Sequence, residues 1–265
     1  IEVCENVATD LDGNDMIDTG EDMWGALGQD DPVYYLFNGA GLKFAHIDED
    51  GYIAYDYGDE DSILIMDYIF NDIIYSDWYA HSVNRSDGSG GLSHSEIFKA
   101  NRALFYFNCV KGVLGMRDME ESYGILPIPK YDESQENYSS LVWVHHDSIV
   151  GIPSGAINPE MCAVVLEALS YEGYYSVIPV LYDTILYGRA AKTAEAKKSL
   201  QIIFASRSYD PGQYWDTVTG LQHSEGLLRL TSRGTADIAS VWGQYDDKII
   251  DCVKVINGMV QDLED

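Results

Sequence analysis

The segment at 122–138 constrains the fold more than any other part of the chain. It begins with a short apolar stretch, continues through Pro127 and Pro129, and ends in acids and amides. Each proline lacks a backbone N–H and has a fixed φ, so a strand cannot continue its hydrogen-bonded ladder here. A second apolar run follows at 141–152. The pattern predicts an extended crossover that carries the chain from one compact unit into another.

Charge limits the ligands that the chain can bind. The 265 residues, 46% of them hydrophobic, suffice for one large domain or two small ones. There are 44 Asp and Glu against 16 Lys and Arg, which gives a net charge of −28. Such a surface repels nucleic acids and anionic membranes, so neither is expected as a partner, whereas cations and neutral ligands are favoured. Solubility alone is the competing explanation for the charge.

Aromatic and cysteine residues further limit the kinds of site that the chain can form. The chain has 20 Tyr and 5 Trp, which either fill a core or line a pocket for sugars, whose apolar faces stack on rings. The four cysteines are scattered and form no CxxC motif, so a zinc site is not supported. Cys109, Cys162 and Cys252 lie in apolar runs and are predicted to be buried, while the sequence leaves disulfides open.

Helix signals recur along the chain. An amphipathic helix is predicted over 59–79, where apolar residues recur at helical spacing. Ser93 opens a capping box, and Asn158, Thr193 and Asp246 are residue types that favour the first position before a helix. We therefore expect further helices to begin at each of these four residues.

Strand signals lie between the helices. Apolar runs predict strands at 103–110, 123–128 and 141–150, and Asp50 with Gly51 predicts a hairpin turn. The mixture of strands and helices indicates an α/β fold. The chain begins without a signal peptide and has no apolar run long enough to span a membrane, which predicts a processed or trimmed chain.

An acidic loop at 10–21 is the sharpest local motif. In a calcium loop of the EF-hand type, oxygen ligands come from positions 1, 3, 5, 7, 9 and 12. Here those positions are held by Asp10, Asp12, Asn14, the Met16 carbonyl, Asp18 and Glu21. Position 6 is Asp15 rather than glycine, and aspartate tolerates a left-handed backbone better than most residues. The loop predicts a structural Ca²⁺, and a solvated acidic turn is the alternative.

Catalytic motifs are absent from the sequence. The chain has no GxSxG nucleophile elbow, no phosphate loop and no GxGxxG fingerprint. His145 and His146 are adjacent in a predicted strand, so they face opposite sides and cannot easily share a metal ion. We therefore expect no enzyme activity. The alternative is a glycan-acting hydrolase with paired carboxylates, which sequence alone does not reveal among 44 acidic residues.

Several motifs in the middle of the chain resemble one protein family. They lie in order at 22–25, 97–105, 116–119, 123–130, 132–135, 138–140, 167–172 and 177–179. Together they resemble the extracellular solute-binding proteins of bacterial ABC importers, of the carbohydrate type related to maltose-binding protein. The resemblance covers most of residues 8–215, and it is weak after about residue 216.

The resemblance implies a partial two-lobed α/β fold of the type II periplasmic-binding-protein kind. Residues 1–122 and 205–265 would form the second lobe, and 123–204 the hinge and a returning part of the first lobe, most of which would precede this chain. The implied function is capture of a carbohydrate, an oligosaccharide, in a cleft that closes about the hinge. Further implications are a membrane permease as partner, a monomeric state, and a lipid-anchored extracellular location for the full-length protein.

Five residues are candidates for contacts with the sugar, because they lie at strand ends, turns or the crossover. They are Phe37, Asn38, Asn108, Trp143 and Trp215. The rings would stack on the sugar, and Asn38 and Asn108 would bridge its hydroxyls. Other possibilities are a peptide-binding member of the same fold and an acidic, calcium-stabilised domain without a ligand of its own.

Overall fold

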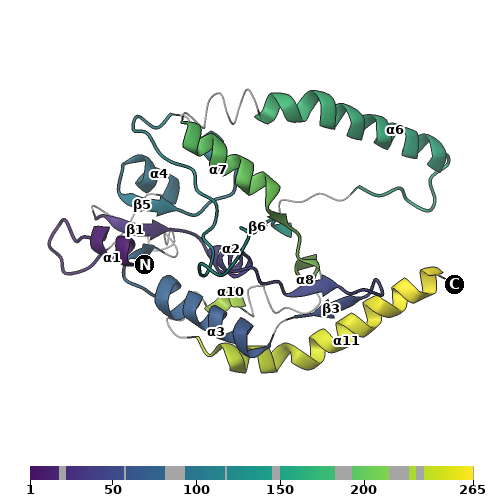
Figure 1. Cartoon of the computed structure of the whole chain (residues 1–265), viewed down its shortest axis with the longest axis horizontal. Coiled ribbons are helices and arrows are strands. Elements are labelled where there is room, and N and C mark those ends of the chain that lie inside the picture. The colour runs from purple at the N-terminus through teal and green to yellow at the C-terminus, as the bar shows by residue number, and fades with distance from the viewer. Residues whose placement is uncertain are drawn as a thin grey trace.

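The computed structural model confirms a mixed α/β fold built around a small parallel sheet (Figure 1). It describes residues 1–17, 22–56, 58–80, 93–116, 118–144, 150–182, 193–214, 227–230 and 236–264. No helix within these ranges has the length and apolar character needed to cross a membrane.

The sheet has three parallel strands in the order β4-β1-β5. They are β1 (Trp24–Leu27), β4 (Tyr79–Ala80) and β5 (Ala103–Tyr106). β1 is the central strand, with Ala26 beside Tyr79 on one side and beside Phe105 on the other. The chain passes from β1 to β4 and then crosses to the far side of β1, so the direction of the connections reverses at the middle of the sheet.

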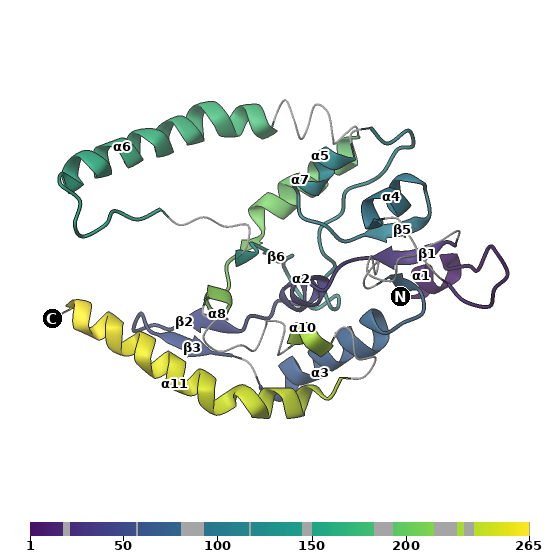
Figure 2. The same cartoon turned by 180° about the vertical axis from the view of Figure 1, so that it is seen from behind.

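Helices flank this sheet on both sides, with α4 (His94–Lys99) on one and α3 (Glu60–Tyr68) on the other (Figures 1 and 2). The predicted capping box is confirmed, because Ser93 and Glu96 each accept the other's backbone N–H. The helix predicted at 59–79 is confirmed from Glu60 onward. It continues as a π-helical segment, η1 (Ile69–Ile74), and ends before β4.

The predicted hairpin is formed by β2 (Ala45–Ile47) and β3 (Ile53–Tyr55), with Gly51 in the left-handed region at φ +86°. A long helix, α11 (Ile238–Glu264), packs against β3 and α3. Its predicted start at Asp246 is wrong, because the helix already runs through that residue. Asp237 lies directly before it and accepts the N–H of Ser240 at 3.0 Å.

Aromatic rings from distant parts of the chain form the centre of the core. Tyr34 and Phe37 of α2 (Pro32–Gly39) pack on Phe44, and Trp242 of α11 approaches the same ring with centroids 5.9 Å apart. The short α1 (Glu2–Val7) lies so close to β1 that a Cβ on Gly25 would come within 2.6 Å of the Cβ of Cys4. Glycine is therefore required in the middle of β1.

The second part of the chain contains few strands. The strand predicted at 123–128 is wrong, because none of these residues belongs to a strand ladder. β6 is Ser140–Leu141 and pairs in parallel with β7 (Arg207–Ser208). Of the strand predicted at 141–150, residues 142–144 are not in a strand, and residues 145–149 lie outside the described residues. β5 ends at Tyr106 rather than at residue 110, and Leu104 and Phe105 are exposed rather than buried.

Between β6 and β7 the chain makes a long excursion, whose described residues include three helical elements. They are α6 (Pro159–Glu172), η4 (Gly173–Val177) and α7 (Ala194–Ala205). The predicted starts are confirmed, because Asn158 accepts the N–H of Met161 at 2.9 Å and Thr193 accepts that of Ala196 at 3.1 Å. α7 packs near α5 (Gly112–Gly115). α6 stands apart from the other elements in both views (Figures 1 and 2), and no residue of it is buried.

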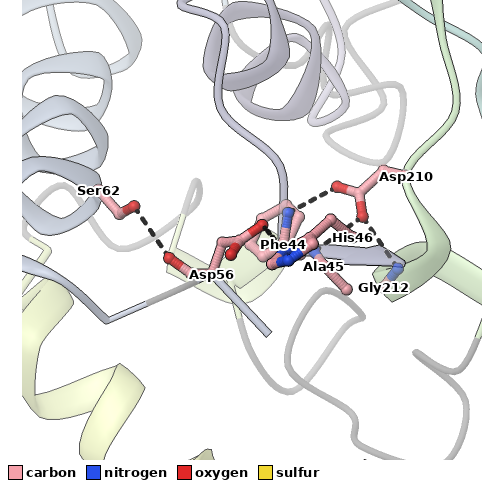
Figure 3. A network of polar contacts seen from close by, with 7 residues as sticks. All are labelled: Phe44, Ala45, His46, Asp56, Ser62, Asp210 and Gly212. Carbon is pink, nitrogen blue, oxygen red and sulfur yellow. Dashed lines mark hydrogen bonds and ion pairs between the residues drawn. The ribbon is translucent and has the colours of Figure 1, made fainter. Parts of the chain in front are cut away.

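A buried carboxylate ties the end of this excursion to the hairpin. Asp210 lies between β7 and α8 (Pro211–Tyr214) and accepts the backbone N–H groups of Phe44, Ala45 and Gly212 at 2.8, 3.2 and 2.9 Å (Figure 3). Its side chain is 3% exposed. Burial raises the pKa of this carboxyl to about 6, although the three N–H donors oppose the rise.

The cysteines differ partly from expectation. All four lie in the described ranges and are free thiols. Cys252 is buried as predicted, and Cys4 is buried as well. Cys162 is exposed, against the prediction, because it lies on the uncovered helix α6.

Candidate functional site

The carboxyl ends of β1 and β5 bring polar side chains together. In open α/β sheets, ligands bind outside the carboxyl ends of the strands, at the point where the direction of the connections reverses. Here that point is the loop 28–31 after β1, together with residues 107–109 after β5. We therefore take this edge of the sheet as the candidate binding site.

The buried side chain of Tyr79 supports the loop after β1. Tyr79 of β4 donates its hydroxyl to the carbonyl of Gln29 at 3.4 Å. A Cβ on Gly28 would come within 2.2 Å of that hydroxyl oxygen, so only glycine allows the loop to lie this close to β4. Burial, together with the nearby carboxylates of Asp30 and Asp31, raises the pKa of Tyr79 well above its ordinary value.

A carboxylate and a second phenol lie at the mouth of this loop. Tyr35 of α2 donates to Asp31 over 3.4 Å, and both side chains are half-buried. Burial, followed by the charges of Asp31 and Cys109, raises the pKa of Tyr35. The phenol therefore remains a neutral hydrogen-bond donor across the physiological range, and Cys109 must lie near enough to sense its charge.

A small cavity opens beyond the end of β5, with a volume of about 130 Å³. Its lining is largely aromatic and aliphatic and includes Phe98, Tyr106, Tyr123, Leu200 and Ile203. Asn108 and Cys109 line the same cavity. Because β1 and β5 pair in parallel, with Leu27 beside Tyr106, this cavity and the acidic rim formed by Asp30 and Asp31 lie at the same edge of the sheet.

The side chain of Asn108 is oriented by the protein. Its Oδ1 accepts the N–H of Cys109 at 2.8 Å. Burial raises the pKa of the Tyr106 phenol, and the Asn108 carboxamide partly opposes that rise. A Cβ on Gly112 would come within 2.4 Å of Cγ of Asn108. Glycine at position 112 therefore leaves the room that this orientation needs.

The predicted sugar-contact residues fall into different environments. Asn108 is exposed at the candidate site. Phe37 is 1% exposed and packs within the core. Trp143 is also buried, and one face of its ring stacks on Tyr34 at a centroid distance of 4.9 Å. Trp215 lies outside the described residues.

Asn38 is bonded entirely within the protein. Its side chain donates to the carbonyl of Leu42 and to Ser208, and accepts from Ser139 at 2.8 Å. These bonds join α2 to the β6–β7 pair. In this conformation neither Phe37 nor Asn38 offers surface to a ligand, so the two residues support the site rather than line it.

Sequence reasoning missed the acidic rim. Asp31 and Tyr35 were not among the candidates, although a signal was present. An apolar run at 24–27 is followed by two aspartates and by Pro32, a combination typical of a strand that leads directly into a helix start.

No family model matches this chain, and no curated protein or solved structure shows significant similarity to it. The candidate site is therefore described from its own geometry.

The acidic loop forms a second site of interest. Asp10 accepts the N–H of Gly13 at 2.6 Å and that of Asp15 at 2.8 Å, so its carboxylate closes the loop. Asp15, at the position where an EF-hand has glycine, takes the left-handed conformation that the position requires, with φ +65°. The backbone thus has the turn that the motif predicts, even without glycine.

Three carboxylates converge in this loop. One oxygen each from Asp10, Asp12 and Asp22 lies within 4.8 Å of the others, which is close enough to share a cation. Asp22 is buried and accepts the N–H of Leu11 at 2.7 Å. It was not among the predicted ligands, while the predicted ligands Asp18 and Glu21 lie outside the described residues. The predicted ligand Asn14 accepts the N–H of Met16 at 2.8 Å, and the Asn14 amide donates to Asp12 at 3.0 Å.

Proposed function

We propose that this protein is the extracellular ligand-binding component of an ABC importer, which captures a carbohydrate without catalysis. The observation that carries the proposal is the uncovered apolar helix formed by α6 and η4. Val164, Leu169 and Tyr175 are each more than 60% exposed. A segment that belongs to the first lobe would have this character when the rest of that lobe is not present.

The apolar residues of this helix lie on all its sides. Over 159–177, the charged residues are Glu160, Glu167 and Glu172. A helix that is hydrophobic all round is normally buried within a protein. A surface patch for one partner would need only one apolar face. The pattern therefore favours burial inside a lobe, as the resemblance to two-lobed binding proteins implies.

The connections of this segment suit a hinge. The excursion that contains α6 begins after β6 and ends at β7. These two strands pair with each other, with Ser140 beside Arg207 and Leu141 beside Ser208. Both ends of the excursion are therefore held at one place. A lobe joined to another through such a pair can rotate about it, and a ligand that contacts both lobes would favour the closed state.

The candidate site has the chemistry that a neutral sugar requires. The carboxylate of Asp31, the phenol of Tyr35 and the carboxamide of Asn108 offer acceptors and donors for hydroxyl groups. Asn108 shares the wall of the cavity with aromatic rings, on which a sugar's apolar face could pack.

We also propose that the loop at 10–22 binds Ca²⁺ in a structural role. The support is the convergence of Asp10, Asp12 and Asp22 and the left-handed turn at Asp15. Carboxylate oxygens are the ligands that Ca²⁺ prefers. The ion would tie α1 to the start of β1, because the loop connects these elements.

The test begins with the protein as its own cells make it. Its intact mass should exceed that of these 265 residues by about one lobe and should include a lipid. The native protein should then bind saccharides from a glycan panel, measured by titration calorimetry, and leave them intact. Cleavage of an oligosaccharide would favour the hydrolase alternative. A native chain of this length that binds no saccharide would refute the importer proposal.

A further inference from the structure

We infer that the cavity beyond β5 takes the acetamido group of an N-acetylated amino sugar. The inference rests on the proposed function, because it names the class of carbohydrate that the site selects. It follows from the volume of the cavity, the chemistry of its wall and mouth, and the charge of its rim.

The volume limits the group that enters. An apolar cavity of about 150 Å³ is known to hold benzene, which has about six non-hydrogen atoms. The cavity here measures about 130 Å³ and so has room for a group of roughly four or five non-hydrogen atoms. An acetamido group has roughly four non-hydrogen atoms and fits this limit, whereas a hexopyranose with its hydroxyls has roughly three times as many.

The wall and the mouth have different chemistry. Rings and aliphatic side chains such as Phe98, Tyr123 and Leu200 offer an apolar surface that suits a methyl group. Asn108 lies at the mouth, where its Oδ1 accepts the N–H of Cys109. A carboxamide has two N–H groups and two oxygen lone pairs. The bond to Cys109 uses one lone pair, which leaves both N–H groups and one lone pair for a second amide.

The rim excludes one class of sugar. Asp30 and Asp31 follow the carboxyl end of β1, which pairs with the end of β5 where the cavity opens, and the Asp31 carboxylate accepts the Tyr35 hydroxyl at 3.4 Å. Like charges placed opposite one another in a binding site are strongly unfavourable. A uronic acid would place its carboxylate against this rim, so an uncharged substituent is favoured over an acidic one.

The experiment compares three trisaccharides on the native protein by titration calorimetry. They are the trimers of N-acetylglucosamine, of glucosamine and of glucose. We expect the N-acetylated trimer to bind at least ~10-fold more tightly than the glucose trimer. Equal affinity for these two would overturn the inference and leave the proposed function standing. Tightest binding of the glucosamine trimer would also overturn it, because attraction between the amino groups and the acidic rim would then determine the affinity. Failure of every saccharide to bind would refute both.

Two matched glycine variants test the role of Asn108. Gly112→Ala places a methyl group against the Asn108 side chain, which must turn away. Gly115→Ala lies in the same short helix and meets nothing within 4 Å. We expect Gly112→Ala to reduce the preference for the N-acetylated trimer to ~3-fold or less, and Gly115→Ala to retain it. An unchanged preference in a folded Gly112→Ala protein would contradict the assignment of Asn108.

Discussion

Asn257 of α11 binds both backbone polar groups of Ile53 in β3. Its Oδ1 accepts the Ile53 N–H at 2.9 Å, and its Nδ2 donates to the Ile53 carbonyl at 2.9 Å. The side chain thus replaces the neighbouring strand that β3 lacks on that side. A helix at the end of the chain closes the edge of a hairpin about 200 residues earlier.

Replacement of Asn257 by leucine should therefore destabilise the protein. The half-buried N–H and carbonyl of Ile53 would lose their partners, and an unsatisfied group of this kind costs about 1–3 kcal/mol. Urea unfolding would measure the loss. The control is Met259→Ala, because Met259 lies in the same helix and is exposed. Equal stability of the two variants would show that the Asn257 bonds contribute little.

Asp210 should make stability depend on pH. The folded-state pKa of this carboxyl, about 6, lies above its ordinary value of 3.8. Its protonated form is therefore favoured by folding, so its contribution is fully present below about pH 3.8 and is lost as the pH rises through about 6. The change over this window is of the order of 3 kcal/mol.

The reference for this measurement is Asp210→Asn, which cannot titrate. The free energy of unfolding of the wild type, relative to this variant, should fall between pH 4 and pH 7, in the window about the pKa of 6. Comparison with the variant removes the contribution of the other carboxylates that titrate in the same range. A difference that does not change with pH would mean that Asp210 is ionised throughout.

Calcium should raise the melting temperature if the acidic loop binds it. A ligand present at ~100 times its dissociation constant stabilises the folded state by about 2.7 kcal/mol. Asp10→Asn should abolish this response. Asp132→Asn is the control, because Asp132, like Asp10, is an aspartate that accepts the N–H of the residue three positions later, here Gln135 at 3.3 Å, but it lies outside the loop. A response that survives in Asp10→Asn would place the ion elsewhere.

Charged residues on α6 should destabilise the native protein if another part of it covers this helix. Val164→Lys and Leu169→Lys would each bury a charge, with an expected loss of several kcal/mol in the free energy of unfolding. Cys162→Ser is the control, because it changes an exposed side chain of the same helix without introducing a charge. Stability unchanged by both lysines would mean that α6 lies bare in the native state.

Local signals could be read from the sequence, whereas contacts between distant segments could not. Ser93, Asn158 and Thr193 each accept the N–H of the residue three positions later, so their roles follow from residue type and position. Asp246 is also a residue type that favours the position before a helix, yet it lies within α11, because Asp237 precedes the helix and Trp242, in an earlier turn, packs on Phe44.

The candidate site shows the same division. Asn108 follows an apolar run, and a strand end is visible in sequence. Phe37 and Asn38 also lie near a turn, but partners at Phe44, Ser139 and Ser208 draw them into the interior. These partners cannot be predicted from the residues next to Phe37 and Asn38 in the sequence. Asp31 and Tyr35 become a pair only through the turn of α2 and the position of β4 behind the loop.

The bare helix α6 also determines where the molecule opens first. Its 14 residues have no tertiary support among the described parts of the chain, and an isolated helix of this length is only marginally stable in water. Its amide hydrogens should therefore exchange with solvent far sooner than those of β1, which is buried along its whole length. Slow exchange in α6 would show that another part of the assembled protein covers this helix.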